Sequence, residues 1–209
     1  MKTIKLSTLL RMCVAALAMT VAAHASASLY QVRLDTRALA GNGWLDLQFN
    51  PGPNTPPAAS AVLSAFTGAF DGPAIVTGDV SGGLPGPVVF GNGASYNDLF
   101  LAITLGGLFS FLVDFDGPFA SEVSDSGSTF ALALYADDEI TPLGNPDGTG
   151  SLLRFELMPA SVAGAGGVMV VVADPGIVSA SAVPEPATLL MIALGLVALG
   201  TARRRTRGN

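Results

Sequence analysis

The acidic side chains that lie close enough in sequence to share a ligand fall into three short runs, each beside turn-forming residues. The runs are Asp114-Phe115-Asp116, Asp137-Asp138-Glu139 and Asn145-Pro146-Asp147. Calcium takes about six to eight oxygen ligands, often from alternate residues of one loop, so each run could contribute to a calcium site. None has the spacing of an EF-hand loop. Asp and Asn also favour turns for backbone reasons alone, so we expect solvated turns, with calcium as the alternative and no other cofactor.

Paired carboxylates can also hydrolyse glycosides, and sixteen acidic residues offer many pairs. Such enzymes hold a general acid and a nucleophile or base about 5–10 Å apart in a cleft. The cleft also needs aromatic platforms for the sugar, and the chain has one Trp and three Tyr. We therefore predict no catalytic residues and no enzyme, with a secreted hydrolase as the weakest alternative.

Trp44 is the residue that separates the two remaining classes of function. It precedes Leu45 and Asp46 in an alternating run, so its ring faces either the core or the solvent. Packing in the core is the commoner fate of such a ring. An aromatic ring exposed beside a groove would instead favour a carbohydrate-binding module. The other candidates for such a ring are Tyr30, Tyr96 and Tyr135.

The distribution of His and Cys excludes several kinds of site. The only residues of these types are Cys13 and His24. If the N-terminal segment is removed, the rest of the chain has neither type. That excludes disulfides, His or Cys zinc sites, haem ligation, thiol nucleophiles and a Ser-His-Asp triad.

Charge is unevenly distributed along the 209 residues. Between residues 28 and 183, fifteen acids face three arginines and no lysine, so this stretch carries a net charge of −12 against −6 for the whole chain. Nucleic acid phosphates need basic partners, so we expect no nucleic acid ligand.

The N-terminus has the layout of a signal peptide. Three basic residues lie in the first eleven positions, and an apolar run of Ala, Val, Leu and Met covers 13–23. Small residues then fit signal peptidase cleavage after Ala25 or Ala27. The apolar run is about half the ~20 residues that span a bilayer, so we predict an exported chain whose residues 1–25 are removed. An uncleaved anchor is the alternative.

The C-terminus combines three elements over residues 184–209. An uncharged stretch rich in Leu, Ala and Gly covers 187–202 and would span roughly 24 Å as a helix, slightly short for a hydrocarbon core. Basic residues follow, which stop transfer and stay in the cytoplasm. Pro-Glu-Pro precedes the span and is expected to be extended. The stop-transfer residues are Arg203, Arg204 and Arg205.

Together, Val183-Pro184-Glu185-Pro186, the short span and the terminal arginines resemble the PEP-CTERM sorting signal of Gram-negative bacteria. The resemblance implies recognition by an exosortase, a polytopic membrane cysteine transpeptidase, and cleavage near the motif. It implies a precursor held in the inner membrane by its C-terminal helix and a product at the cell surface or in the extracellular matrix. It also implies a link to exopolysaccharide and biofilm, and the alternative is a plain single-pass anchor.

The stretch between these two signals is predicted to be a β-sandwich. Ten short apolar or alternating runs are separated by Gly, Pro, Asn and Asp, and helical periodicity is hard to find outside 58–66. Gly106-Gly107, between two alternating runs, predicts a two-residue hairpin. We therefore predict an antiparallel β-sandwich or jelly roll over 28–173 and a small-residue linker over 174–183.

Two functions remain open for this domain. The first is a noncatalytic surface or matrix protein, and the second is a carbohydrate-binding module delivered by the same tail. The expected partners of the chain are signal peptidase, the exosortase, the membrane during sorting, and exopolysaccharide.

Overall fold

The computed structural model describes residues 29–70, 72–162 and 164–183, which form twelve strands and one short 3₁₀ helix. The predicted signal peptide, the Pro-Glu-Pro motif, the C-terminal helix and the arginine cluster lie outside these residues. Each of the ten runs expected to be a strand contains one. Residues 58–66, where a helix was the alternative, hold most of β3. The elements are β1 (Leu29–Asp35), β2 (Asn42–Pro51), β3 (Ser60–Thr67), β4 (Ala74–Thr77), β5 (Val80–Gly82), β6 (Val88–Gly91), β7 (Asp98–Thr104), β8 (Leu108–Asp116), η1 (Pro118–Ala120), β9 (Ser128–Ala136), β10 (Leu153–Met158), β11 (Gly167–Val172) and β12 (Val178–Ala182).

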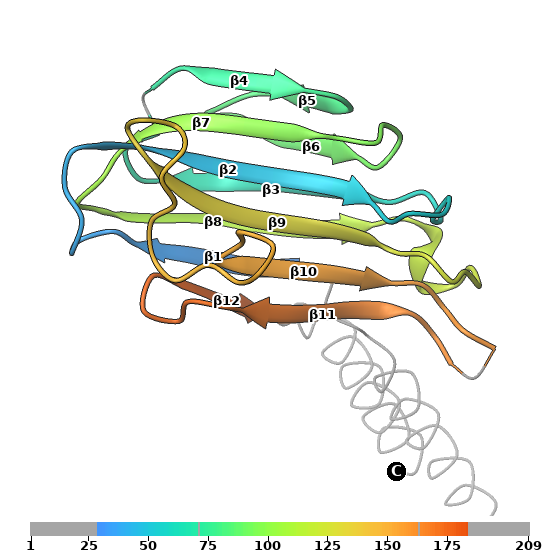
Figure 1. Ribbon diagram of the computed structural model, residues 1–209. Coiled ribbons are helices and arrows are strands. Elements are labelled where there is room, and N and C mark those ends of the chain that lie inside the picture. Colours follow the sequence, from blue (N-terminus) through green and yellow to red (C-terminus); the bar gives the residue numbers. More distant parts are fainter. Residues whose placement is uncertain (1–28, 71, 163, 184–209) are drawn as a thin grey trace, which may run out of the picture. The chain divides into compact units, whose positions relative to one another are not determined.

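The strands form two six-stranded antiparallel sheets that lie one over the other (Figure 1). Sheet A has the order β12-β1-β8-β3-β6-β5, and sheet B has the order β11-β10-β9-β2-β7-β4. The first four strands of the chain alternate between the two sheets, so few strands pair with their neighbour in sequence. The all-β, antiparallel class predicted from the sequence is confirmed.

The core lies between the two sheets and follows from alternation along each strand. Residues of one parity point inward and are almost fully buried, because successive side chains of a strand point to opposite faces. Phe115 of β8 is at the centre, with its ring 5.2 Å from Phe155 and 6.0 Å from Phe130, both of sheet B. Tyr30 also packs here, 5.0 Å from Phe155. These rings join the two sheets into one core.

The hairpin predicted at Gly106-Gly107 is wrong. β7 pairs with β2 and β4 in sheet B, whereas β8 pairs with β1 and β3 in sheet A. The two glycines therefore carry the chain from one sheet to the other. Thr36, fully buried, holds this crossing: its hydroxyl donates to Gly107 O (2.9 Å) and accepts from the N–H groups of both glycines. Local sequence shows a tight turn, but only the partners of each strand decide whether the turn makes a hairpin.

The linker predicted over 174–183 is also wrong. β12 lies inside this range and pairs with β1, from Leu34↔Val178 to Tyr30↔Ala182. The N–H of Val183 still donates to Leu29 O (2.9 Å). The compact unit therefore runs to Val183, because the open edge of β1 supplies hydrogen-bond partners for a segment of low strand propensity.

None of the helices in the described ranges has the length and apolarity that crossing a membrane requires.

Candidate functional site

The outward face of sheet B carries two carboxyl groups where a solvated polar surface would be expected. Asp46 of β2 and Asp98 of β7 point away from the core, since their neighbours Leu45, Leu47 and Leu99 point into it. Asp46 lies opposite Phe100 and Asp98 opposite Gln48, so the carboxyls are diagonal neighbours on adjacent strands. Despite facing outward, Asp46 is only 6% exposed and Asp98 only 7%.

These two carboxyl groups hydrogen-bond to each other, which requires a proton between them. Gln48 Nε2 donates to the second oxygen of Asp46 (2.8 Å), and the Tyr96 hydroxyl donates to Asp98. Apart from the proton that the pair shares, no N–H or O–H group of the described residues donates to the buried Oδ1 atoms of the two aspartates.

Burial and mutual proximity shift the titration of this pair. Burial is the largest cause that raises the pKa of Asp98 to about 8, followed by its hydrogen bond to Asp46 and the charge there. Burial also raises the pKa of Asp46, against hydrogen bonds from Asp98 and Gln48 that lower it. With a pKa of about 8, Asp98 is mostly protonated at neutral pH, which supplies the proton between the two carboxyl groups.

Aromatic rings lie beside the pair on the same face, with Phe100 opposite Asp46 in the sheet. Trp44 stacks on Phe100 with ring centroids 4.7 Å apart and planes 8° from parallel, and Tyr135 meets Phe100 edge-on at 6.1 Å. Tyr96 stays 45% exposed, and its pKa is raised to about 12 by burial and by the charges of Asp98 and Asp46. Its hydroxyl therefore remains a donor throughout the physiological range.

Asn97, fully buried, positions the loop that carries Tyr96 and Asp98. Its side-chain amide donates to Phe49 O (2.8 Å), and its backbone N–H donates to Asn50 Oδ1 (2.8 Å) at the end of β2. Gly78 sits so close below that a Cβ there would lie 2.0 Å from Tyr96 O, which explains a glycine with φ of 76°. The site is therefore built on a rigid support.

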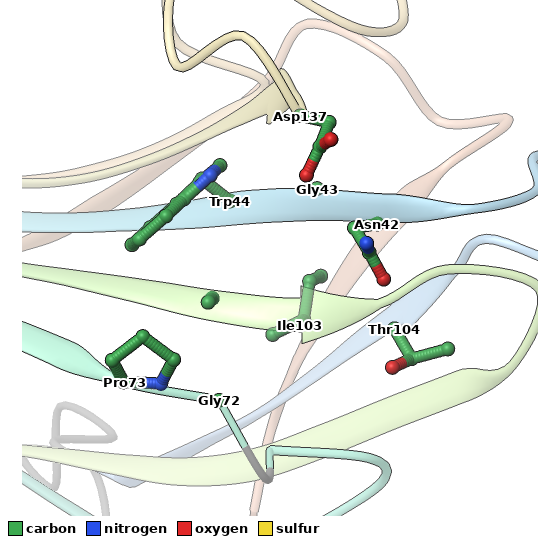
Figure 2. A pocket seen from close by; sticks show the side chains of 9 residues that line it. Asn42, Gly43, Trp44, Gly72, Pro73, Ile103, Thr104 and Asp137 are labelled. Atoms are coloured by element: carbon green, nitrogen blue, oxygen red, sulfur yellow. The ribbon is translucent and has the colours of Figure 1, made fainter.

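A groove of about 320 Å³ opens beside Trp44 on the same face. Figure 2 shows the Trp44 and Pro73 rings on the two sides of β7. Ala102 lies between these two rings, and its small side chain leaves the groove open. The rim is polar and comes from Asn42, Thr104 and Asp137. An aromatic wall with a few polar groups at the rim suits a small polar ring.

A second, smaller cavity of about 40 Å³ lies on the other side of β2. The loop Gly144–Ser151 forms one wall with Thr149 and Ser151, and the sheet forms the other with Asp46, Gln48 and Tyr135. Asp174 anchors the start of this loop by accepting from the Asn145 N–H (2.7 Å). The cavity is lined by oxygen-bearing side chains and by one buried carboxyl group.

Of the three acidic runs considered for calcium, Asp137–Glu139 and Asn145–Asp147 lie in turns or loops, whereas Asp114–Asp116 is the end of β8. Asp138 accepts hydrogen bonds from the N–H groups of Ile140 and Thr141, and Glu139 has φ of 64° in this turn. Asp147 accepts from the Thr149 and Ser151 N–H groups, and Asp116 accepts from Gly117 N. In the part of the chain that the structure describes, no three His, Cys, Asp or Glu side chains gather as a metal site.

The aromatic residues chosen from the sequence separate into two groups. Tyr30 is 7% exposed and belongs to the core. Trp44, for which core packing was the commoner expectation, lies half-buried on the outward face with Tyr96 and Tyr135. The carboxyl pair was missed, because Asp46 and Asp98 are 52 positions apart and no local motif joins them. The signal in the sequence was that Asp46 lies two residues from Trp44 and from Gln48, so the three side chains share one face of the strand.

Comparison with protein-family models finds the PEP-CTERM protein-sorting motif at residues 182–205. The match begins at Ala182, the last residue of β12, so the sorting signal follows the sandwich directly. No curated protein and no solved structure matches the chain. The motif implies an exported protein, made as a membrane-anchored precursor that an exosortase processes for the cell surface. The chain thus carries a PEP-CTERM protein-sorting motif at its C-terminal end.

Proposed function

We propose that the protein is a noncatalytic carbohydrate-binding module of the cell surface or extracellular matrix, where it attaches to exopolysaccharide. The observation that carries the proposal is the outward face of sheet B. It combines a groove of about 320 Å³, an aromatic wall at Trp44 and polar groups at the rim. Sugars stack their apolar faces on aromatic rings and direct their hydroxyls to polar side chains, as such a groove allows.

The geometry of the carboxyl pair supports a binding role over hydrolysis. Glycosidases hold their two carboxyl groups about 5–10 Å apart, so that a sugar or a water fits between them. Asp46 and Asp98 instead hydrogen-bond to each other and are almost fully buried. Their arrangement leaves no room for a glycosidic bond between the two groups.

The binding test compares the protein recovered from its host with two variants. Trp44→Ala removes the wall of the groove and should weaken binding to the host exopolysaccharide by about tenfold or more, since stacking aromatics dominate such sites. Leu108→Ala is the matched control, because Leu108 is 57% exposed and projects from sheet A. Equal binding by wild type and Trp44→Ala would refute the proposed site.

The sorting test follows the precursor in hosts with and without the exosortase. Cleavage close to Pro186 should remove Ala187 to Asn209 only when the enzyme is present. Pro184→Ala combined with Pro186→Ala should let the C-terminal helix extend outward, and Glu185→Ala removes the carboxylate. Both variants should accumulate as uncut precursor in the inner membrane. Pro53→Ala, in an exposed loop of the ectodomain, is the control. A wild-type chain that stays full-length with the enzyme present would indicate a plain anchor.

A further inference from the structure

Four strands lie at the edges of the two sheets, and three of them are poorly suited to pairing with another chain. β5 has only three residues and ends at Gly82, whose φ is 86°. β4 has four residues, and Pro73 immediately precedes it. β12 consists of Val, Ser and Ala, whose small side chains bury little area against a partner. Short edge strands and Pro are devices that keep a sheet edge from pairing with other molecules.

The fourth edge strand, β11, has none of these devices. Its sequence, Gly-Val-Met-Val-Val-Val, contains no charge and no Pro. All six residues pair with β10, from Met158↔Gly167 to Leu153↔Val172, without a shift of register. Residues 28–183 carry a net charge of −12, so two copies of this chain repel each other over most approaches. An uncharged edge of six residues is therefore where a second copy meets little repulsion.

The core-facing side chains of β11 are incompletely covered. Val170 lies opposite Phe155 and Val172 opposite Leu153, and both partners on β10 are fully buried. These valines therefore point to the space between the sheets. Val170 is nevertheless only half-buried, and Val172 is 37% exposed. β12 is the edge strand of sheet A on the same side of the sandwich (Figure 1), and its small side chains do not cover the valines.

The backbone groups on the open side of β11 suit pairing with the same strand. The Ala173 N–H donates to Leu152 O (2.9 Å), toward β10. Because successive residues of a strand direct their backbone groups to alternate sides, Val168, Val170 and Val172 direct theirs away from β10. No strand of the described residues pairs with this side. Two antiparallel copies centred on Val170 would form three hydrogen-bonded residue pairs, with two hydrogen bonds in each pair.

We propose that β11 pairs with β11 of a second copy, so that sheet B continues across a two-fold axis into the partner. Val170 then lies opposite its own counterpart, and Val168 opposite Val172 of the second copy. On the outward face Met169, which is 50% exposed, lies opposite Val171 of the second copy. The interface is thus apolar on both faces of the sheet. It leaves the groove beside Trp44 free, since β2 is three strands from this edge.

The first test measures the mass of the protein recovered from its host by sedimentation velocity over a range of concentrations. The wild type should shift from monomer to dimer as its concentration rises. Met169→Lys places a charge on a half-exposed position, which the monomer tolerates. In the dimer this charge lies opposite an apolar side chain and close to its own counterpart, so the Kd should rise about tenfold or more.

Ile75→Lys is the matched control for this variant. Ile75 is 51% exposed and lies on the outward face of β4, at the opposite edge of the same sheet. The added charge is the same in both variants, so the difference between them reports the edge that pairs. Ile75→Lys should dimerise as the wild type does.

The second test fixes the register. Val170→Cys should link two copies under oxidising conditions, because Cα atoms of a hydrogen-bonded pair are about 5.5 Å apart, within reach of a disulfide. Val172→Cys should not link, since its counterpart would be four residues away along the strand, roughly 13 Å. The unsubstituted protein gives the background from Cys13, which precedes the sandwich.

Each result supports or overturns the proposal. A monomer at every concentration overturns it, as does a dimer that Ile75→Lys weakens as much as Met169→Lys does. A complex in which β11 of one copy holds a different protein also overturns it. Linking through Val172→Cys and not through Val170→Cys would contradict the register. If Met169→Lys does not fold, the cysteine variants decide, and failure of Val170→Cys to link overturns the proposal.

Discussion

The outward faces of the two sheets have the same architecture and different chemistry. Sheet A presents polar, charged and aliphatic side chains, such as Ser110 of β8, which shares a hydrogen bond with Thr67 (2.8 Å), and Asp114, whose Oδ1 atom is buried. Sheet B presents stacked aromatic rings and, on the same face, a carboxyl pair that is more than nine-tenths buried. Among the described residues, only sheet B has two such carboxyl groups hydrogen-bonded to each other.

The carboxyl pair of sheet B destabilises the folded state without an evident structural benefit. Burying two carboxyl groups against each other destabilises the folded state unless a partner compensates their charge. Sheet A packs on the same inner core without such a pair among its described residues, so the fold itself does not require the carboxyl pair of sheet B.

The largest effect should come from the core that both sheets share. Phe115→Ala removes a ring that contacts Tyr30, Phe49, Phe130 and Phe155, and should lower the free energy of unfolding by about 3–5 kcal/mol. Denaturant unfolding followed by Trp44 fluorescence and by circular dichroism should give coincident transitions. Separate transitions would mean that the two sheets unfold independently, and the comparison of their faces would lose its common reference.

The pH dependence of stability should come from sheet B. Asp98 has a folded pKa of about 8 and an unfolded pKa near 3.9, so the folded state binds the extra proton between these values. The contribution of this proton to the free energy of unfolding is fully present below about pH 4 and is lost as the pH rises through 8. The free energy of unfolding falls by at most about 1.4 kcal/mol per pH unit over this range. The opposite trend comes from Asp147, whose pKa is lowered first by the Thr149 hydrogen bond, and whose contribution is lost as the medium becomes acidic.

Asp98→Asn tests this assignment. The amide mimics the protonated carboxyl and still donates to Asp46, so the decline in unfolding free energy between about pH 4 and 8 should flatten. Urea unfolding across that range measures it, with the non-titrating change Ser110→Ala on sheet A as the control that keeps the slope. An unchanged slope in Asp98→Asn would contradict a shared proton.

The connection between the sheets should show an intermediate effect. Thr36→Val keeps the shape of the side chain but removes the hydroxyl that binds Gly106 and Gly107, at a cost of about 1–3 kcal/mol. Thr67→Val removes an exposed hydroxyl on sheet A and should cost much less. Thermal unfolding compares the two variants. Equal losses of stability would show that the Thr36 hydroxyl stabilises the crossing no more than an exposed hydroxyl stabilises sheet A.

The smallest effect should come from the face of sheet A. Ser110→Ala should change stability by no more than about 0.5 kcal/mol and leave glycan binding unchanged. A loss of binding in this variant would indicate that the ligand binds sheet A and not sheet B.

The sequence alone was enough for features that depend on local pattern. Alternation in segments such as 108–115 predicted strands, and their number without helices predicted an all-β sandwich. The sorting signal was recognisable because its three elements are contiguous, and the family model places it at 182–205. Each of these is written in neighbouring residues, so no knowledge of the fold is required.

The tertiary structure alone decided which distant residues meet. Gly106-Gly107 looks like a hairpin in sequence, yet β7 and β8 belong to different sheets, and β12 exists only because β1 offers it an edge. Asp46 and Asp98 become a pair through the register of β2 with β7. Their shared proton and their burial are properties of that register. A one-dimensional pattern cannot encode them, because both arise from strand pairing across long separations in the chain.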